Sequence, residues 1–93
     1  MTGDVELLEA LRGALMAEGW CAVPRYHEVP GRLRVWHPSN PVVGETVNVA
    51  CERDGLWFRS STGALMARRH DIPGAVAYVE RELGALVRPH APV

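Results

Sequence analysis

Cysteine and histidine are the residues of this sequence best suited to do chemistry. Cys21 and Cys51 are too few for a disulfide framework, and both sit in strand-like sequence, so we expect small, buried apolar side chains. Spacing alone leaves a Cys51–His37 couple open, but burial would make the Cys51 thiol inert. No metal-ligand spacing relates the histidines, which are His27, His37, His70 and His90. We therefore predict no metal site.

Motifs for phosphate binding and nucleophilic catalysis are missing from the sequence. The glycines form neither a Walker-type loop nor a G-x-G-x-x-G. Ser60-Ser61-Thr62 offers hydroxyls, but no G-x-S-x-G surrounds it, and it is typical of a strand end that runs into a turn. Carboxylates are too sparse in the middle of the chain for an acid–base pair. The sequence favours binding over catalysis, without a cofactor, and a small enzyme using a cysteine or histidine is a remote alternative.

Two amphipathic helices enclose the middle of the chain. Apolar residues recur every three or four positions over residues 4–18, and again after Asp71. Gly19 can take a left-handed conformation just past the first helix, and Trp20 supplies the apolar contact that usually follows. Asp71 can cap the second helix, with Pro73 in its first turn.

Strand-like segments lie between the helices at 20–29, 32–37, 45–52 and 56–60, with a short fifth segment at 64–68 left open. Pro30-Gly31 and Asp54-Gly55 predict two-residue hairpin turns. Pro38-Ser39-Asn40-Pro41 predicts a loop rather than a strand. Short connections favour an antiparallel meander. The predicted fold class is α+β: a two-layer sandwich of helix, four- or five-stranded antiparallel sheet and helix, with both helices on one face.

The predicted turns set a register that sorts the side chains between the two faces of the sheet. Arg25 then pairs with Trp36, and Cys51 pairs with Phe58. The core face carries Trp20, Ala22, Tyr26, Leu33, Val35, Val47, Val49, Cys51, Leu56 and Phe58. The opposite face carries His27 and Arg32 and five candidate binding residues: Arg25, Arg34, Trp36, Trp57 and Arg59.

Length and composition suit one domain over residues 1–93, with an ordered core at about 4–88 and a loose tail at 89–93. No apolar run approaches the ~18 residues that span a bilayer. The acidic N-terminus does not resemble a signal peptide, so we expect a soluble, cytoplasmic protein. All ten basic residues are Arg, a bias typical of GC-rich bacterial genomes.

The function expected from this pattern is protein binding. A net charge of -1 argues against a protein that holds nucleic acid or lipid by bulk charge. Exposed Trp among Arg is typical of interaction surfaces. We expect a non-enzymatic interaction or regulatory module, homodimeric, that self-associates through this face or an edge of the sheet. Weak binding of RNA or single-stranded DNA by the same face is the alternative, since Trp stacks on bases and Arg pairs with phosphate. A simply solvated face is the third reading.

The order of helix, Gly19-Trp20, sheet and helix resembles the double-stranded-RNA-binding-like layout, which includes small toxins of the HicA type. Those toxins carry a Gly-Ser-His signature in the first hairpin, whereas here Pro30-Gly31 is followed by Arg32-Leu33-Arg34. The resemblance is one of topology and carries over no residues.

Overall fold

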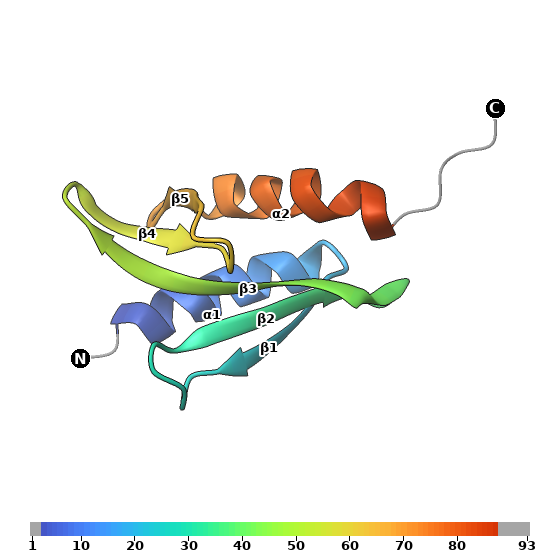
Figure 1. Cartoon of the computed structure of the whole chain (residues 1–93), viewed down its shortest axis with the longest axis horizontal. Helices are drawn as coiled ribbons and strands as arrows, with labels where there is room; N and C mark the ends of the chain where they lie inside the picture. The colour runs from blue at the N-terminus through green and yellow to red at the C-terminus, as the bar shows by residue number, and fades with distance from the viewer. Residues whose placement is uncertain (1–2, 88–93) are drawn as a thin grey trace.

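The computed structural model describes residues 3–87, which form two helices and one five-stranded sheet (Figure 1). The elements are α1 (Gly3–Ala17), β1 (Cys21–Arg25), β2 (Arg32–His37), β3 (Asn40–Glu52), β4 (Gly55–Arg59), β5 (Leu65–Arg68) and α2 (Ile72–Val87). All neighbouring strands are antiparallel, in the order β1-β2-β3-β4-β5. The predicted α+β class is confirmed, and the segment at 64–68 does form a strand. The predicted tail at 89–93 lies outside the described residues.

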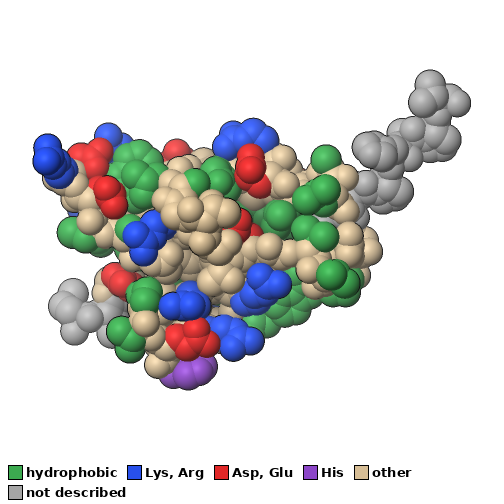
Figure 2. All heavy atoms as spheres, viewed as in Figure 1, with side chains coloured by type: hydrophobic (Ala, Val, Ile, Leu, Met, Phe, Trp, Pro, Cys, Tyr) green, Lys and Arg blue, Asp and Glu red, His purple; other side chains and the backbone are tan. Residues whose placement is uncertain are grey.

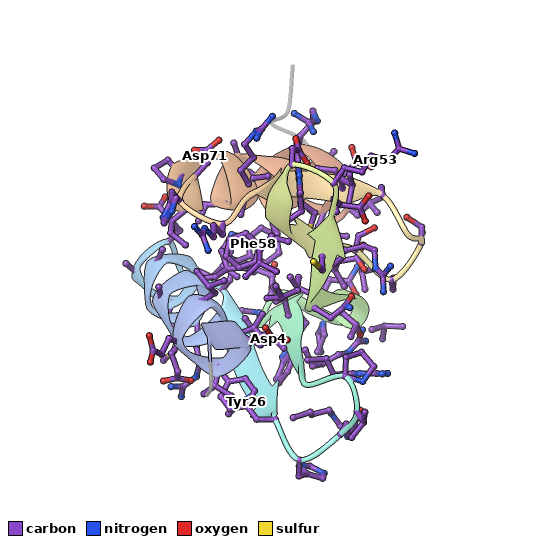
Figure 3. All side chains as sticks on the ribbon, turned by 90° about the vertical axis from the view of Figure 1, so that its left-hand side faces the viewer. Asp4, Tyr26, Arg53, Phe58 and Asp71 are labelled. Carbon is purple, nitrogen blue, oxygen red and sulfur yellow. The ribbon has the colours of Figure 1, made fainter. Side chains whose placement is uncertain are left out.

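Both helices cover one face of the sheet, and the core lies between the two layers. Phe58 points from β4 into the space between the sheet and the helices (Figure 3), and its side chain is 0% exposed. The core comprises Leu8, Leu11, Leu15, Trp20, Ala22, Leu33, Val35, Val47, Val49, Phe58, Ala67, Ala75, Val79 and Leu83. The strand residues among these alternate along each strand, as a sheet with one covered face requires. We call the other face, which neither helix covers, the open face.

The end of α1 forms as the sequence predicts. Gly19 has a φ of 93° and donates its N–H to the Met16 carbonyl oxygen at 3.0 Å. The Trp20 N–H donates to the Leu15 carbonyl oxygen, also at 3.0 Å, which completes the paired bonds of a Schellman motif. The Trp20 indole N–H then donates to Glu80 Oε2 of α2 at 2.8 Å. One residue therefore ends α1 and joins it to α2.

The start of α2 is also as predicted. Asp71 Oδ1 accepts the Gly74 N–H at 2.9 Å, and the Asp71 carbonyl oxygen accepts the Ala75 N–H at 3.1 Å. This side-chain bond satisfies one of the N–H groups that a helix leaves unpaired in its first turn.

The first hairpin has a longer connection than predicted. Residues 26–31 join the strands, so that Arg25 pairs with Arg32, and Trp36 pairs with Cys21 rather than with Arg25. The predicted register is therefore wrong by four residues (25 − 21). Since four is an even shift, each residue that remains in the strands keeps the face that was predicted for it. Tyr26 and His27, predicted on the core face and the open face, lie in the connection instead.

Contacts outside the hairpin explain why β1 ends early. The Tyr26 hydroxyl donates to Glu9 Oε2 of α1 at 2.5 Å, and this bond takes Tyr26 out of the strand. Glu28 in the connection lies 3.3 Å from Arg25 Nη1 and 3.2 Å from Arg32 Nε, where it bridges the two strand ends. These contacts hold residues 26–31 as a connection longer than a two-residue turn.

The second hairpin turns one residue earlier than predicted. Arg53 and Asp54 occupy the turn, and Glu52 pairs with Gly55. Gly55 has a φ of 119°, and no other residue type within 3–87 has a positive φ, so the predicted turn with positive φ at Asp54 as well is wrong. The turn instead places its positive φ on the glycine that follows it.

This shift of two residues again preserves the faces but changes the partners. Val49, rather than Cys51, lies opposite Phe58 in the core. Cys51 is exposed and Cys21 is partly exposed, so the prediction of two buried cysteines is wrong. Cys51 lies too close to the turn for the helices to cover it.

β3 is longer than predicted because it begins at Asn40. Only Pro38 and Ser39 form the turn before it, and Asn40 pairs with His37. The predicted loop therefore contains the first two residues of a strand. Pro41 falls in an irregularity of the pairing and has no cross-strand partner, so its missing N–H removes no ladder hydrogen bond.

The long β3 makes the sheet stepped. It pairs with β2 over residues 40–48 and with β4 over residues 48–52. Asn48 is the single β3 residue with a partner in both neighbours, Arg32 on one side and Arg59 on the other. The β1–β2 hairpin thus lies along the first part of β3, and the β4–β5 hairpin along the last part (Figure 1). We call this overlap at Asn48 the step.

Candidate functional site

The open face carries its arginines in two adjoining cross-strand rows. The first row runs Arg25, Arg32, Asn48, Arg59 across four strands. The second row contains Arg34, between Val23 and Thr46. At a strand spacing of about 4.8 Å, the first row spans about 14 Å. Figure 2 shows basic side chains gathered over this part of the molecule, with hydrophobic side chains towards its two ends.

The two tryptophans of the open face lie far apart. Trp36 pairs with Gly44 and Trp57 pairs with Ala50, on opposite sides of the step. Six residues of β3 (50 − 44) separate those partners, which is about 20 Å at about 3.3 Å per residue. Both indoles are only partly exposed. The structure thus puts all five predicted residues on one face but does not bring the tryptophans together, and neither is as open to water as expected.

Trp57 has partners within its own hairpin. Its indole N–H donates to Asp54 Oδ1 at 2.9 Å, and the Arg68 guanidinium lies 5.1 Å from the ring centroid. Arg68 also pairs with Asp54 at 2.8 Å. The hydrogen bond from Trp57 is the main cause that lowers the pKa of Asp54, and the Arg68 charge acts in the same direction. These contacts give Trp57 a structural role in the β3–β4 turn.

Arg59 is held by a neutral partner. With the Asn48 amide oriented to satisfy both groups, its oxygen accepts from Arg59 Nη2 at 3.2 Å and its nitrogen donates to the Arg59 carbonyl oxygen at 3.3 Å. Glu28 pairs with both Arg25 and Arg32, whereas no ion pair in the described part of the chain involves Arg59. Within the described residues, Arg59 is thus held by hydrogen bonds with an amide and not by an ion pair.

Arg34 lies over a glycine, and it too lacks an ion pair within residues 3–87. A Cβ atom on Gly44 would lie 2.8 Å from Arg34 Nη2 and 2.7 Å from the Val35 carbonyl oxygen. A side chain at position 44 would therefore collide with the Arg34 guanidinium and with the backbone of β2.

A hollow of about 510 Å³ opens at the step. Its lining comprises Pro30, Arg32, Thr46, Asn48, Arg59, Ser60, Ser61, Thr62 and Gly63. Arg59 is the one predicted site residue in this lining. The sequence predicted the correct face for Arg32 but did not indicate it as a binding residue. Ser60-Ser61-Thr62 was interpreted only as a strand end. Three hydroxyl residues directly after an arginine of the open face were the available signal.

The Cys51–His37 couple left open by the sequence does not form. His37 lies at the β2–β3 turn, where its Nδ1 is 2.8 Å from Ser39 Oγ and its ring meets Trp20 edge-on at 5.2 Å. Cys51 lies at the other end of β3, eleven residues (51 − 40) beyond the partner of His37. That separation is about 36 Å along an extended strand, which excludes a Cys–His pair for nucleophilic catalysis.

In the range 3–87, no three side chains of His, Cys, Asp and Glu gather as metal ligands would. Neither α1 nor α2 is long and apolar enough to cross a bilayer. Comparisons with protein-family models, with curated proteins and with solved structures found no match to this chain.

Proposed function

We propose that this chain is a non-enzymatic interaction module that binds an acidic segment of a partner protein on its open face. The observation that carries the proposal is the arginine content of that face. Arg25, Arg32, Arg34 and Arg59 stand in two adjoining rows, and within residues 3–87 only Glu28 forms ion pairs with any of them. A surface of one sign attracts and orients a partner of the opposite sign.

The charge distribution of the rest of the molecule supports a localised partner site. The net charge of the whole chain is -1 although the open face is basic. Acidic residues concentrate on the helix side, where α1 carries Asp4, Glu6 and Glu9. A protein with this polarity directs an anionic partner to the sheet and away from the helices.

The same charges argue against a twofold self-contact of the open face. In such a contact each patch meets its own copy, so the arginine rows would face each other. Like charges placed opposite each other cost binding free energy. Self-association at a sheet edge, the other form of the expected homodimer, avoids this repulsion and is tested by the molar mass of the protein in solution.

Nucleic-acid binding, the alternative from the sequence, lacks a stacking platform on this face. Single-strand binders stack successive bases on neighbouring aromatic rings. Here Trp36 and Trp57 lie on opposite sides of the step, and Trp57 is engaged by Asp54 and Arg68. We therefore favour a protein partner.

The test measures the anisotropy of a labelled glutamate-rich peptide titrated with the protein. The variant Arg25→Gln/Arg34→Gln removes two positive charges from the open face at positions outside the hollow. The matched control, Arg53→Gln/Arg81→Gln, removes two charges elsewhere. Arg53 points away from the sheet at the tip of the β3–β4 turn (Figure 3), and Arg81 lies on α2 beside Glu82.

We expect the face variant to raise the Kd about ten-fold or more, and the control to change it less than about two-fold. Equal weakening by both variants would mean that only net charge matters, and the proposal would be wrong. Tighter binding of a single-stranded oligonucleotide of equal charge would favour the nucleic-acid alternative. Light scattering that gives twice the monomer mass, together with no peptide binding, would favour self-association.

A further inference from the structure

We propose that the hollow at the step binds a phosphate monoester. The inference rests on the proposed function, because the hollow lies on the open face. It deepens that function by naming the anionic group that binds there. A phosphorylated side chain of a partner and a small phosphorylated molecule present the same chemistry here.

Two arginines line the hollow from opposite sides of Asn48, and Arg32 Nε donates to the Pro30 carbonyl oxygen at 3.3 Å. Arg32 and Arg59 are the two cross-strand partners of Asn48, so their Cα atoms lie two strand spacings apart, about 9–10 Å. The planar guanidinium fork binds two oxygens of one phosphate at once. Two such forks on opposite sides of Asn48 can hold a single oxyanion between them, with the amide beneath it.

The third wall of the hollow is a turn that the protein holds in place. Glu45 Oε1 accepts the Ser61 N–H at 2.8 Å and the Thr46 N–H at 2.9 Å, and it also accepts the Ser61 hydroxyl. Ser60, which is 2% exposed, places its Oγ 2.8 Å from Thr62 Oγ1. A turn fixed in this way loses little conformational entropy when a ligand binds.

The charges around the hollow sum to plus one, since Arg25, Arg32 and Arg59 stand against two carboxylates, and this favours an anionic ligand. The two carboxylates are Glu28, which pairs with Arg32, and Glu45, which holds the turn. Arg59 contributes a charge that no carboxylate in the described residues pairs with. A phosphate monoester carries about −1.5 to −2 charges at neutral pH and three acceptor oxygens. A phosphodiester offers a single charge, and therefore a weaker interaction.

The hollow is larger than a phosphate group alone requires. Its volume of about 510 Å³ falls within the range of about 300–1,000 Å³ that is usual for small-molecule sites. The residue types are those of an anion site: two Arg, one Asn and four hydroxyl side chains, with one apolar ring from Pro30. The phosphate would occupy the centre between the arginines and leave space for the rest of the ligand.

The test is an NMR titration of the isotopically labelled protein with inorganic phosphate, O-phosphoserine, glycerol 3-phosphate and a phosphoserine peptide. We expect shifts of the amide signals of Asn48, Ser61 and Gly63. Arg59→Gln should raise the Kd for each ligand about ten-fold or more. Arg53→Gln, which removes the same charge outside the hollow, should leave the Kd unchanged. Arg59→Lys keeps the charge but loses the fork, and should weaken binding by an intermediate factor.

Arg32→Gln is the second variant, which keeps the proposal testable if the spectrum of Arg59→Gln shows that it is unfolded. Shifts spread over all arginines, with equal weakening by Arg53→Gln, would mean charge screening only and would overturn the proposal. So would an oligonucleotide without terminal phosphate that binds more tightly than the monoesters. Phosphate binding without any binding of the glutamate-rich peptide would uphold the hollow and refute the proposed function. Binding of the glutamate-rich peptide without any binding of phosphate would refute the phosphate site and leave the proposed function standing.

Discussion

Trp20 is the residue whose removal we expect to damage the fold most. Its side chain is 2% exposed, and it lies where α1, the sheet and α2 meet. It contributes the apolar contact of the Schellman motif, an edge-on contact with His37 at 5.2 Å and a hydrogen bond to Glu80 at 2.8 Å. Trp20→Ala removes all of these contacts together.

The expected loss follows from burial and from the hydrogen bond. Truncating a buried Trp to Ala costs about 3–5 kcal/mol of unfolding free energy. Domains of this size unfold with about 5–15 kcal/mol, so the variant loses roughly a fifth of its stability or more. At about 4–8 °C per kcal/mol, the Tm should fall by at least about 12 °C. Trp20→Phe keeps most of the apolar area but loses the indole N–H, and should cost about 1–3 kcal/mol.

The assay is thermal and urea unfolding followed by circular dichroism. A double-mutant cycle of Trp20→Phe with Glu80→Ala, which removes the acceptor, measures the hydrogen bond, for which we expect a coupling of about 1 kcal/mol. A Trp20→Ala protein that melts within a few degrees of the parent would refute the packing of both helices against this indole. Zero coupling in the cycle would refute the energetic role of the Glu80 contact while leaving the packing argument intact.

Three further predictions concern the turns and the open face. Gly55→Val should lower the unfolding free energy by more than about 1 kcal/mol in urea titrations, because Gly55 has a φ of 119°; Gly55→Asn should cost clearly less, and equal costs would contradict the argument. Gly44→Ala should destabilise the protein because its Cβ would meet the Val35 carbonyl oxygen at 2.7 Å, whereas Gly13→Ala, with nothing within 4 Å, should not; a neutral Gly44→Ala in thermal melts would refute the close approach. The hydrogen bond from Trp57 lowers the pKa of Asp54, so the stabilisation that Asp54 contributes is present above its ordinary pKa of about 3.9 and is lost as the pH falls through its folded value. The indole N–H signal of Trp57 should therefore move in an acid NMR titration, and should not move in Asp54→Asn.

Local features of this fold were predictable because short stretches of sequence determine them. Gly19 with Trp20, and Asp71 with the turn after it, supply their own hydrogen-bond partners within a few residues. The two faces of the sheet were predictable for a different reason. Side chains alternate with a period of two, and both register errors were even, so Leu33 still lies in the core and Arg34 still lies on the open face.

The registers themselves were not predictable, because contacts between distant residues decide them. The first connection extends because Tyr26 bonds to Glu9, and no turn propensity reflects a partner in another helix. The second turn shifts because Asp54 takes both Trp57 and Arg68 as partners. Each contact lengthens or moves its turn. The residue pairs Pro30-Gly31 and Asp54-Gly55 alone therefore predict the wrong turn.

The candidate site was predictable as a face but not as a hollow. Arg25, Arg34 and Arg59 follow from alternation alone. The hollow depends on where β2 begins and β4 ends relative to β3, and that offset sets the overlap at Asn48. This offset depends on the registers of both hairpins, which the sequence predicted incorrectly. The hollow could therefore not be located from the sequence.

The step also leaves the two hairpins of the sheet with few hydrogen bonds in common. Hydrogen bonds run across β2, β3 and β4 together only at Asn48, so little of the sheet's own bonding joins the β1–β2 hairpin to the β4–β5 hairpin. The helices supply the remaining connection, since α1 packs on β1, β2 and β3 while α2 packs on β3 and β5. Amide hydrogen exchange should therefore differ between the hairpins, in the manner of separate cooperative units. A ligand held between Arg32 and Arg59 spans the two hairpins and binds only when both are formed, so it should slow exchange in both at once.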